Sequence, residues 1–300
     1  MKNAQQFEPK VERVFACDTA VGESPLWDPV TEKLFWVDIP SGRVFCGDPT
    51  TGMYDTRMSP TAVGALALCR DGHLLVAAGA ELQSWSRHEA RGGHEAIAHI
   101  PQDSVASQFN DGKAGPDARF WVGVLDPAPV RRPVGAIYGF GATGAPALLM
   151  DNLLVPNGIA WSPAGDRMIF SDSGQGKVWS LPFDPHLGPL AAPQPWLDWR
   201  RDDMGAPDGA AMDADGCYWS CGIFSGAIHR FDQAGTHIES YRLPISQPTM
   251  CCFGGPDLKT LFVTNMIVRL TTAQRAAQPL AGSVVALKVN IAGAPVGVFG

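Results

Sequence analysis

Several kinds of segment are missing from this chain of 300 residues. No apolar run approaches the roughly 18 residues of a membrane-spanning helix. The N-terminus is polar and lacks the apolar core of a signal peptide. Lys and Arg are not clustered and the formal net charge is −7, which argues against a nucleic-acid partner. We therefore expect a cytoplasmic protein that binds neither membranes nor nucleic acid.

Signals for disulfides and for long helices are also missing. The seven cysteines are odd in number and irregularly spaced, which fits a reducing compartment better than a disulfide framework. No stretch has a sustained helical period. Residues 271–281 could hold a short helix, but Pro279 and the lack of an apolar face favour an exposed excursion. Residues 87–99 are polar and are expected to form a loop.

What the chain does contain is a repeated unit, made of an apolar run, a tight turn and a second apolar run. The clearest copy is residues 156–172, where Asn157 heads the first run and residues 162–165 form the turn. Six copies occur at spacings of about 41 to 51 residues, in the range of propeller blades. The residues at the head of each copy are Glu23, Gly64, Asn110, Asn157, Asp208 and Thr249.

This repeat predicts an all-β fold, a six-bladed β-propeller of four-stranded antiparallel blades. Six units of about 45 residues fill the chain, so we expect residues 1–300 to be one domain. Residues 11–17 alternate like a strand before the first unit, and the apolar run 283–289 has no partner after it. We expect these two end segments to pair in one blade and close the ring, because closure removes exposed sheet edges.

The head residues of the six copies form a predicted ring, because a radial repeat places equivalent positions at one height and radius. Four of the six carry carboxylate or carboxamide oxygens, which are costly to bury without a partner. The carboxylates of Glu23 and Asp208 would repel one another in the channel unless a positive charge lay between them. A divalent cation with oxygen ligands resolves both problems. The alternative is that each polar head residue only caps its turn.

At these positions the chain resembles the senescence-marker-protein/gluconolactonase/regucalcin family of six-bladed propellers. The resemblance runs in order through nearly the whole chain. It implies hydrolysis of sugar-acid lactones at one divalent metal, with Glu23, Asn157 and Asp208 as ligands. It also implies that Asn110 contacts the substrate and that Asp208 acts as the base. The matching motifs are Gly-Glu-Ser-Pro-Leu-Trp at 22–27, Phe-Asn-Asp-Gly-Lys at 109–113, Arg-Phe-Trp-Val-Gly at 119–123, Pro-Asn-Gly-Ile-Ala at 156–160 and Pro-Asp-Gly at 207–209.

Two positions depart from the family pattern, and both concern substrate recognition. Gln108 stands where the family's lactonases often have an arginine. Asp126 is the one nearby residue able to replace a glutamate that binds sugar hydroxyls in some members. Gln108, Asp126 and Arg43 are therefore candidates to bind hydroxyls at the channel mouth, and the identity of the lactone stays open.

The chemistry expected of this ring follows from its donors. Ligands that are all oxygen favour Ca²⁺, Mg²⁺ or Mn²⁺, and the resemblance also admits Zn²⁺ or Fe²⁺. A bound cation would polarise the lactone carbonyl and lower the pKa of a bound water. Either Asp208 would deprotonate the attacking water through a free oxygen, or a metal-bound hydroxide would itself attack the carbonyl. No Gly-x-Ser-x-Gly motif is present and no histidine heads a repeat, so a serine or histidine mechanism is disfavoured.

The sequence therefore predicts a metal-dependent enzyme acting on an aldonolactone or a similar small lactone. One alternative is a propeller that binds a metal or small ligand for regulation without turnover. Another is an organophosphate or aryl-ester hydrolase using the same metal site. A sugar lactonase needs several hydroxyl partners at the channel mouth, whereas an organophosphatase tolerates an apolar pocket. The oligomeric state is left open.

Overall fold

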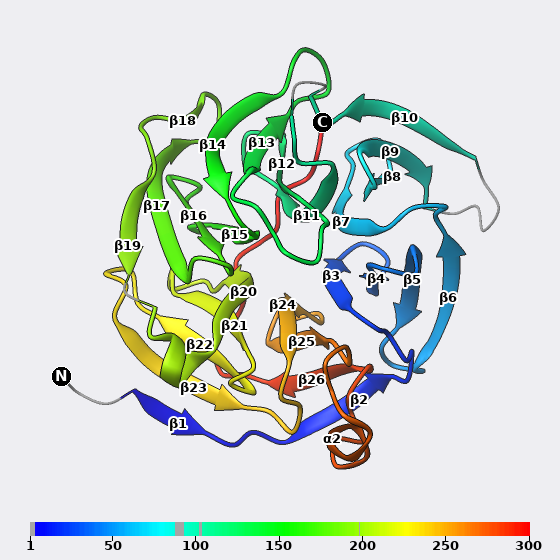
Figure 1. Ribbon diagram of the computed structural model, residues 1–300. Coiled ribbons are helices and arrows are strands. Elements are labelled where there is room, and N and C mark those ends of the chain that lie inside the picture. Colours follow the sequence, from blue (N-terminus) through cyan, green and yellow to red (C-terminus); the bar gives the residue numbers. More distant parts are fainter. Residues whose placement is uncertain (1–3, 88–92, 102–103, 198) are drawn as a thin grey trace.

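The computed structural model of the chain describes residues 4–87, 93–101, 104–197 and 199–300. Their strands form six sheets around a central axis, which confirms the predicted six-bladed propeller (Figure 1). Within these residues the helices are two short segments, α1 (Arg201–Met204) and α2 (Thr272–Ala276). No helix in the described ranges is long and apolar enough to cross a membrane.

The first three blades each have four antiparallel strands. Blade one contains β3 (Gly22–Asp28), β4 (Lys33–Asp38), β5 (Arg43–Asp48) and β6 (Met53–Met58). Blade two contains β7 (Val63–Leu68), β8 (His73–Ala78), β9 (Glu81–Ser86) and β10 (His94–His99). Blade three contains β11 (Gln108–Ala114), β12 (Phe120–Leu125), β13 (Gly135–Phe140) and β14 (Ala147–Leu153).

The other three blades keep this plan, and blades four and five each have one additional short strand. Blade four contains β15 (Pro156–Trp161), β16 (Arg167–Asp172), β17 (Lys177–Asp184) and β19 (Gln194–Leu197), with the short β18 (Gly188–Pro189) also paired to β17. Blade five contains β20 (Ala206–Met212), β21 (Tyr218–Ile223), β22 (Ala227–Phe231) and β23 (His237–Arg242). Blade six contains β24 (Pro248–Gly254), β25 (Thr260–Asn265), β26 (Val284–Lys288) and β2 (Val11–Phe15).

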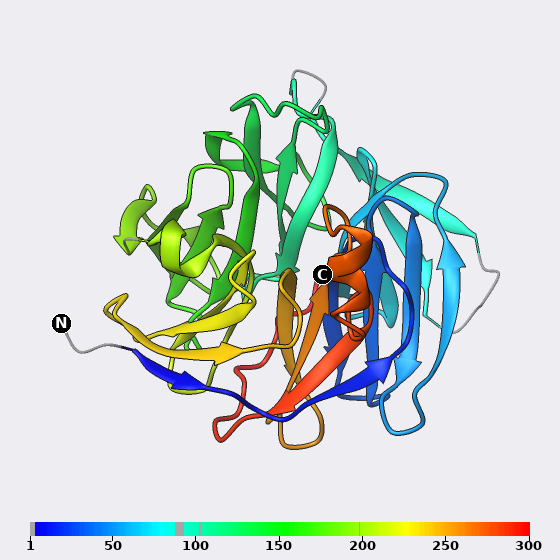
Figure 2. The same ribbon diagram turned by 60° about the horizontal axis from the view of Figure 1, so that its bottom comes forward.

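The two ends of the chain close the ring as predicted. β2 pairs antiparallel with β26, and Val11 lies opposite Leu287. Phe15 is buried and stacks on Trp36 of blade one, with ring centroids 4.5 Å apart. The closing strand therefore also joins blade six to blade one. A further strand that the sequence did not predict, β1 (Gln5–Phe7), pairs parallel to β23 on the outer edge of blade five (Figure 2).

The prediction of a loop over residues 87–99 is wrong for the second half of this stretch, which forms β10. This strand pairs with β9 and is largely exposed. Backbone pairing to β9 rather than burial of an apolar face stabilises it, so its polar composition carries no strand signal. Residues 88–92 of this stretch lie outside the described residues.

The stretch 271–281 is exposed as expected, and it also contains α2. The Thr271 hydroxyl accepts a hydrogen bond from the backbone N–H of Gln274, whose carboxamide accepts one from Thr271. This reciprocal pair is a capping box, which satisfies the free N–H groups of a helix start. No residue of α2 is buried, so capping rather than an apolar face holds this helix.

The direction of the inner strands separates two ends of the channel. In blade three, Gln108 at the start of β11 pairs with Leu125 at the end of β12, so the chain returns to the same end. The same antiparallel order holds in every blade. We call the end with Glu23, Asn157 and Asp208 the head end and the opposite one the far end. The turns between first and second strands therefore lie at the far end, and the loops between second and third strands at the head end.

The strand register shifts at the head of all six inner strands. The shifts fall between Phe109 and Gly112 in β11, between Asn157 and Ala160 in β15, and between Pro207 and Ala210 in β20. β3, β7 and β24 shift at the equivalent places. Because β-bulges of this kind bend a strand and re-aim its side chains, the head residues are freed from the regular alternation of the strand.

Candidate functional site

Three of the predicted ring residues are joined by hydrogen bonds. Asn110 donates from Nδ2 to Oδ1 of Asn157 at 3.0 Å. Asn157 in turn donates from Nδ2 to Oδ1 of Asp208 at 2.6 Å. These residues head the inner strands β11, β15 and β20, so three neighbouring blades meet here. The structure thus brings together Asn110, Asn157 and Asp208.

Glu23, at the head of β3, belongs to the same cluster. It is 7% exposed and Asp208 is 6% exposed. The negative charge of Asp208 contributes to raising the pKa of Glu23, which shows that the two carboxylates are close. Oε2 of Glu23 accepts a hydrogen bond from the backbone N–H of Ser24 at 3.0 Å. Within the described ranges, neither carboxylate forms an ion pair with a Lys, Arg or His side chain.

The electrostatics of the ring disfavour two negative charges. Burial raises the pKa of Glu23 well above the ordinary value, and the charges of Asp208 and Asp111 add to the rise. Burial also raises the pKa of Asp208, followed by the charge of Asp111, whereas the hydrogen bond from Asn157 opposes the rise. Ionisation of both carboxylates is therefore costly unless a cation joins them.

Asp111 is a third carboxylate beside the ring, and sequence reasoning missed it. It is 3% exposed, and its Oδ2 accepts a hydrogen bond from the backbone N–H of Ile159 at 3.2 Å. Burial raises its pKa, and the positive charge of Lys113 opposes the rise. The available signal was the Asn-Asp-Gly sequence, which by itself predicts only a turn. The bulge that brings Asp111 to the ring depends on pairing with β12.

The donors at the ring suit a hard divalent cation. Glu23 and Asp208 have carboxylate oxygens and Asn157 a carboxamide oxygen, the donor types that Ca²⁺, Mg²⁺ and Mn²⁺ prefer. In the part of the chain that the structure describes, no three His, Cys, Asp or Glu side chains are grouped to hold a metal ion. A cation here would therefore depend on the Asn157 amide in addition to the two carboxylates.

The predicted substrate-binding residues Gln108 and Asp126 lie at the head end. Gln108 is half-buried at the start of β11. Asp126 directly follows β12, the strand that pairs with β11. The Asp126 carboxylate binds Nε of Arg132 at 2.6 Å and accepts from the backbone N–H of Ala128 at 3.1 Å. Arg132 is the main cause that holds the pKa of Asp126 below its usual range. Asp126 is therefore engaged within its own loop.

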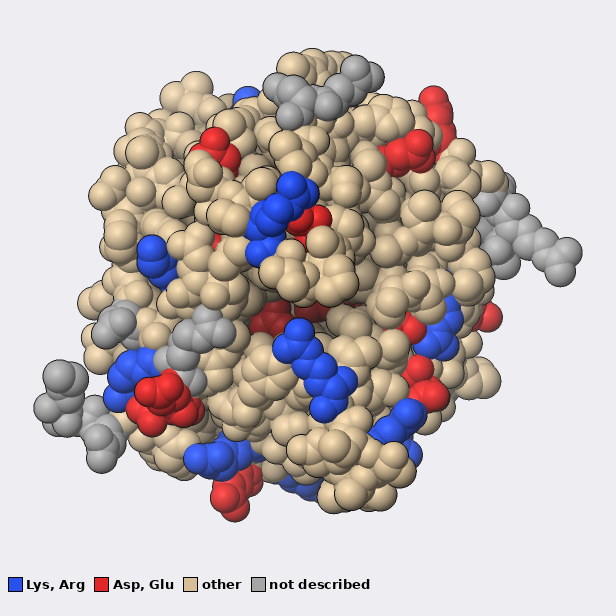
Figure 3. All heavy atoms as spheres, viewed as in Figure 1, with Lys and Arg blue, Asp and Glu red and all other residues tan. Residues whose placement is uncertain are grey.

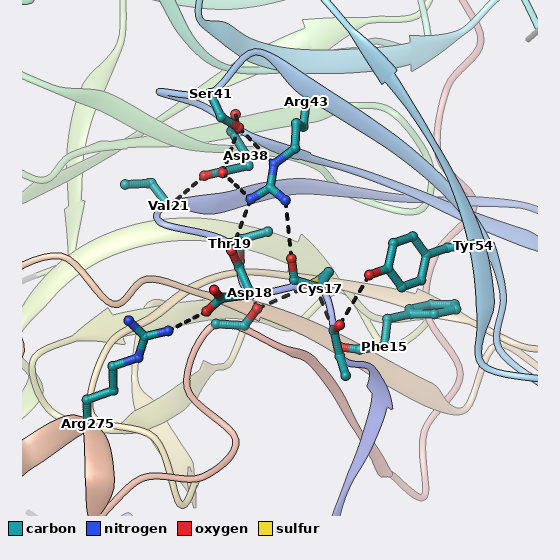
Figure 4. Close-up of polar contacts among 12 residues, drawn as sticks. Phe15, Cys17, Asp18, Thr19, Val21, Asp38, Ser41, Arg43, Tyr54 and Arg275 are labelled. Carbon is teal, nitrogen blue, oxygen red and sulfur yellow. Dashed lines mark hydrogen bonds and ion pairs between the residues drawn. The ribbon is translucent and has the colours of Figure 1, made fainter.

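Arg43, the third residue considered for hydroxyl binding, is instead a structural tie (Figure 4). Its Nη2 binds Oδ2 of Asp38 at 2.7 Å and the backbone carbonyl of Asp18 at 3.0 Å. Its Nε donates to the Ser41 hydroxyl at 3.0 Å. Asp38 also accepts from the backbone N–H of Val21 at 2.9 Å. These bonds fasten the segment after β2 to blade one.

The head end has a central hollow when it is viewed along the axis (Figure 3). Acidic atoms lie on the floor of the hollow, and basic side chains lie on two opposite sides of it. The head-end loops include residues 126–134, with Arg131, and the segment before α2, with Arg269. Burial lowers the pKa of Arg131, Asp126 opposes this effect, and the charge of Arg269 adds to it. Two arginines from separate blades therefore lie within electrostatic range of one another at this end.

Comparison with known proteins places this arrangement in a family. A family model described as the SMP-30/Gluconolactonase/LRE-like region matches residues 21–267. The chain is 33% identical over 275 residues to the 6-deoxy-6-sulfogluconolactonase of Pseudomonas putida, covering 92% of this chain and 93% of that protein. It is 29% identical over 260 residues to a pentonolactonase of Haloferax volcanii, covering 85% and 84%. A solved calcium-binding regucalcin of Agrobacterium tumefaciens matches with a TM-score of 0.93 at 25% identity, covering 99% of this chain and 100% of that one. The chain therefore belongs to the SMP-30/gluconolactonase/LRE-like family.

Proposed function

We propose that this enzyme hydrolyses the lactone of a sugar acid at the head-end ring, using a divalent cation bound by Glu23, Asn157 and Asp208. The observation that carries the proposal is the pair of buried carboxylates, Glu23 and Asp208, which have no cationic partner among the described residues. Asn157 links this pair to Asn110. The sulfogluconolactonase and pentonolactonase relatives match most of the chain and support a sugar lactone as the substrate class.

Each side chain has a role that its contacts support. A bound divalent cation would supply positive charge beside the lactone carbonyl, where negative charge develops as the ester bond opens. Asn110 donates from Nδ2 to Asn157 and to the carbonyl of Pro156, each at 3.0 Å, so its amide oxygen remains for a sugar hydroxyl or a water. Asp208 takes the proton of the attacking water through Oδ2, since Oδ1 accepts the Asn157 bond.

Gln108 and Asp126 are proposed to contact further hydroxyls of the substrate. They lie at the head ends of β11 and β12, which are paired strands of blade three. Asp126 keeps its charge because Arg132 holds its pKa low, so its oxygens remain acceptors at neutral pH. These contacts would orient the sugar ring over the carboxylates.

The test is a metal-replacement assay of lactone hydrolysis. The protein is stripped with a chelator, refilled with Ca²⁺, Mg²⁺, Mn²⁺, Zn²⁺ or Fe²⁺ in turn, and assayed for acid release from a panel of sugar lactones. We expect hydrolysis that depends on the added ion and disappears on stripping again. Metal binding without turnover of any lactone would contradict the proposal and favour a regulatory propeller. Turnover of aryl esters or organophosphates alone would favour the other hydrolase class.

The cysteines support the cytoplasm as the compartment of this enzyme. All seven are free in the structure, and six of them are buried. Burial raises the pKa of Cys69 to about 12, so this thiol is not ionised at neutral pH and is a poor nucleophile. Free, unreactive thiols are typical of proteins from a reducing compartment.

A further inference from the structure

A cavity lies at the far end of the channel, away from the head-end ring. Its volume is ≈ 370 Å³, which is within the range of small-molecule sites. The turns between first and second strands line it, including Pro116 and residues 162–165. Residues 294–297 of the C-terminal segment form another part of its wall. We call this cavity the far-end chamber.

The walls of the far-end chamber are almost entirely uncharged. Of the residues that line it, all of which the structure describes, Lys113 alone carries a formal charge. A sugar lactone, with its several hydroxyl groups, would find few partners against such walls. The chamber is therefore chemically different from the head-end ring. Its apolar surface comes from side chains such as Leu26, Trp161, Met212 and Phe253.

Lys113 stands where the far-end chamber approaches the ring. It follows Asn110 by three residues on β11, and its Nζ contacts the backbone carbonyl of Ala210 on β20. Its positive charge works against the rise in the pKa of both Glu23 and Asp111, so the ammonium group lies near the ring. It forms no ion pair with any described residue. A half-buried ammonium group beside apolar walls favours an anion as a partner.

We infer that the far-end chamber binds an amphipathic monocarboxylate, with its carboxylate against Lys113 and its alkyl chain along the apolar walls. Charge complementarity selects the head group, because Lys113 is the one charged residue among those that line the far-end chamber. The apolar walls select an alkyl chain, because transfer of CH₂ groups from water into an apolar site is favourable. This inference does not rest on lactone hydrolysis, since it is argued from the walls of the far-end chamber and from Lys113.

The C-terminal segment forms one wall of the far-end chamber. Backbone hydrogen bonds anchor it on both sides of the chamber, from Ala294 N–H to the Met212 carbonyl and from Phe299 N–H to the Leu68 carbonyl, both at 2.9 Å. Val296 lies between these anchors, lines the chamber and is 39% exposed. In the ribbon view this segment runs behind the centre of the propeller (Figure 1).

The direct test is isothermal titration calorimetry of the full chain with sodium decanoate. Decanol has the same chain without the charge, and butyrate has the same head group with a short chain. We expect saturable one-to-one binding of decanoate, with an affinity at least tenfold higher than for decanol or butyrate. Because no lactone is turned over in this measurement, its result is independent of the lactonase assays.

Three variants locate the binding site. Lys113→Met is expected to weaken decanoate binding tenfold or more and to leave decanol binding unchanged. Val296→Trp is expected to weaken both ligands by filling the far-end chamber, at a position that is already partly exposed. Lys177→Met is the matched control, because Lys177 is exposed at the start of β17 at the head end. Circular dichroism confirms that each variant is folded.

Several results would overturn the inference. Folded wild-type protein that shows no saturable decanoate binding, or that binds decanoate no better than decanol, would exclude it. Equal decanoate affinity in the wild type and in Lys113→Met would do the same. If Lys113→Met does not fold, the comparison of decanoate with decanol and the behaviour of Val296→Trp decide the question.

Discussion

Asp208 combines two opposing properties in one side chain. Its carboxylate is buried beside those of Glu23 and Asp111, which disfavours ionisation and raises its pKa. It also accepts a 2.6 Å hydrogen bond from Asn157, which fixes the direction of its oxygens. A buried charge without a partner destabilises the free protein, and the same charge gives a cation its affinity. The residue is therefore expected to affect stability and activity in opposite directions.

Asp208→Asn separates these two effects, because it removes the charge and keeps the size of the side chain. We expect it to abolish divalent-metal binding and to lower kcat for lactone hydrolysis by about 10² or more, the range for loss of a positioned acid–base group. We also expect the melting temperature of the metal-free protein to rise. Calorimetric metal titration, lactone assays and thermal denaturation measure the three effects. Full lactonase activity in stripped Asp208→Asn protein would refute the assigned role.

The raised pKa values of Glu23 and Asp208 predict a pH effect on stability. A carboxyl group whose folded pKa is above its unfolded value makes the folded chain hold more protons between the two values. The free energy of unfolding therefore falls as pH rises through that window. With chelator present, the wild type should lose stability relative to Asp208→Asn as pH is raised above about 4, the ordinary range of a carboxyl group.

Denaturant titrations at each pH, with wild type and Asp208→Asn side by side, check this prediction. Comparing the two proteins cancels the effect of groups that make the free energy of unfolding rise with pH. His229 is one such group, because burial lowers its pKa to about 3. A saturating divalent ion should restore the stability of the wild type at the higher pH. Parallel pH profiles for the two proteins would show that these carboxyl groups are not coupled to folding.

At the scale of elements, two of the head-end loops each contain a residue other than glycine with a left-handed backbone. Phe224, after β21, has a φ of 73° and Arg269, before α2, has a φ of 71°. This left-handed region is unfavourable for residues other than glycine, and such strain is often kept at functional sites. The guanidinium carbon of Arg269 lies 5.8 Å from the centre of the Phe224 ring. These loops therefore hold a basic and an aromatic side chain in fixed positions at the head end.

Arg131 and Arg269 predict a preference for lactones with a negatively charged substituent. Replacing both with Gln should raise KM for such a lactone by about 5- to 10-fold and leave KM for a neutral lactone within about twofold, because only the charged group loses attraction. Arg275→Gln is the control, since Arg275 lies on α2 and pairs with Asp18. Steady-state kinetics with one charged and one neutral lactone measure the effect. An equal change for both lactones would argue against this specificity.

The site was predictable where a residue's place follows from the repeat, and unpredictable where it depends on a distant partner. The six heads were found because each precedes a turn at a fixed distance. Asp111 was missed because its position depends on the bulge opposite β12. The tie between Arg43 and Asp38, and the pair of Arg132 with Asp126, each depend on how a loop folds back. Neither the repeat nor the hydrophobic pattern of the sequence predicts such contacts.

At the scale of the whole molecule, an aromatic stack joins the first and last blades. The rings of Phe15 and Trp36 are stacked at 4.5 Å, and those of Trp36 and Phe45 at 4.9 Å. All three side chains are almost completely buried. The stack therefore holds the closing strand β2 against blade one. The architecture was predictable because its closing strands are apolar, whereas β1 carries little apolar signal.

Phe15→Ala is predicted to cost about 3–5 kcal/mol of the free energy of unfolding, the range for removing a buried aromatic ring. Phe7→Ala is the control in the same terminal segment. Phe7 is half-buried and stacks on Tyr241 at 4.8 Å, so it should cost about 1 kcal/mol. Urea denaturation followed by tryptophan fluorescence measures both. Similar losses for the two variants would mean that closure of the ring contributes little to stability.

Pairing of β2 with β26 also determines when the ring of blades can close during synthesis of the chain. β2 ends at Phe15 and its partner β26 begins at Val284, so β2 waits about ten to sixty seconds at synthesis rates of about 5–20 residues per second. During that time β2 is an unpaired edge that other nascent chains can join. A chain that stalls before Val284 has five blades and an open ring. The final closure of this propeller is therefore timed by translation, and slow codons near the end of its gene would prolong the period of greatest aggregation risk.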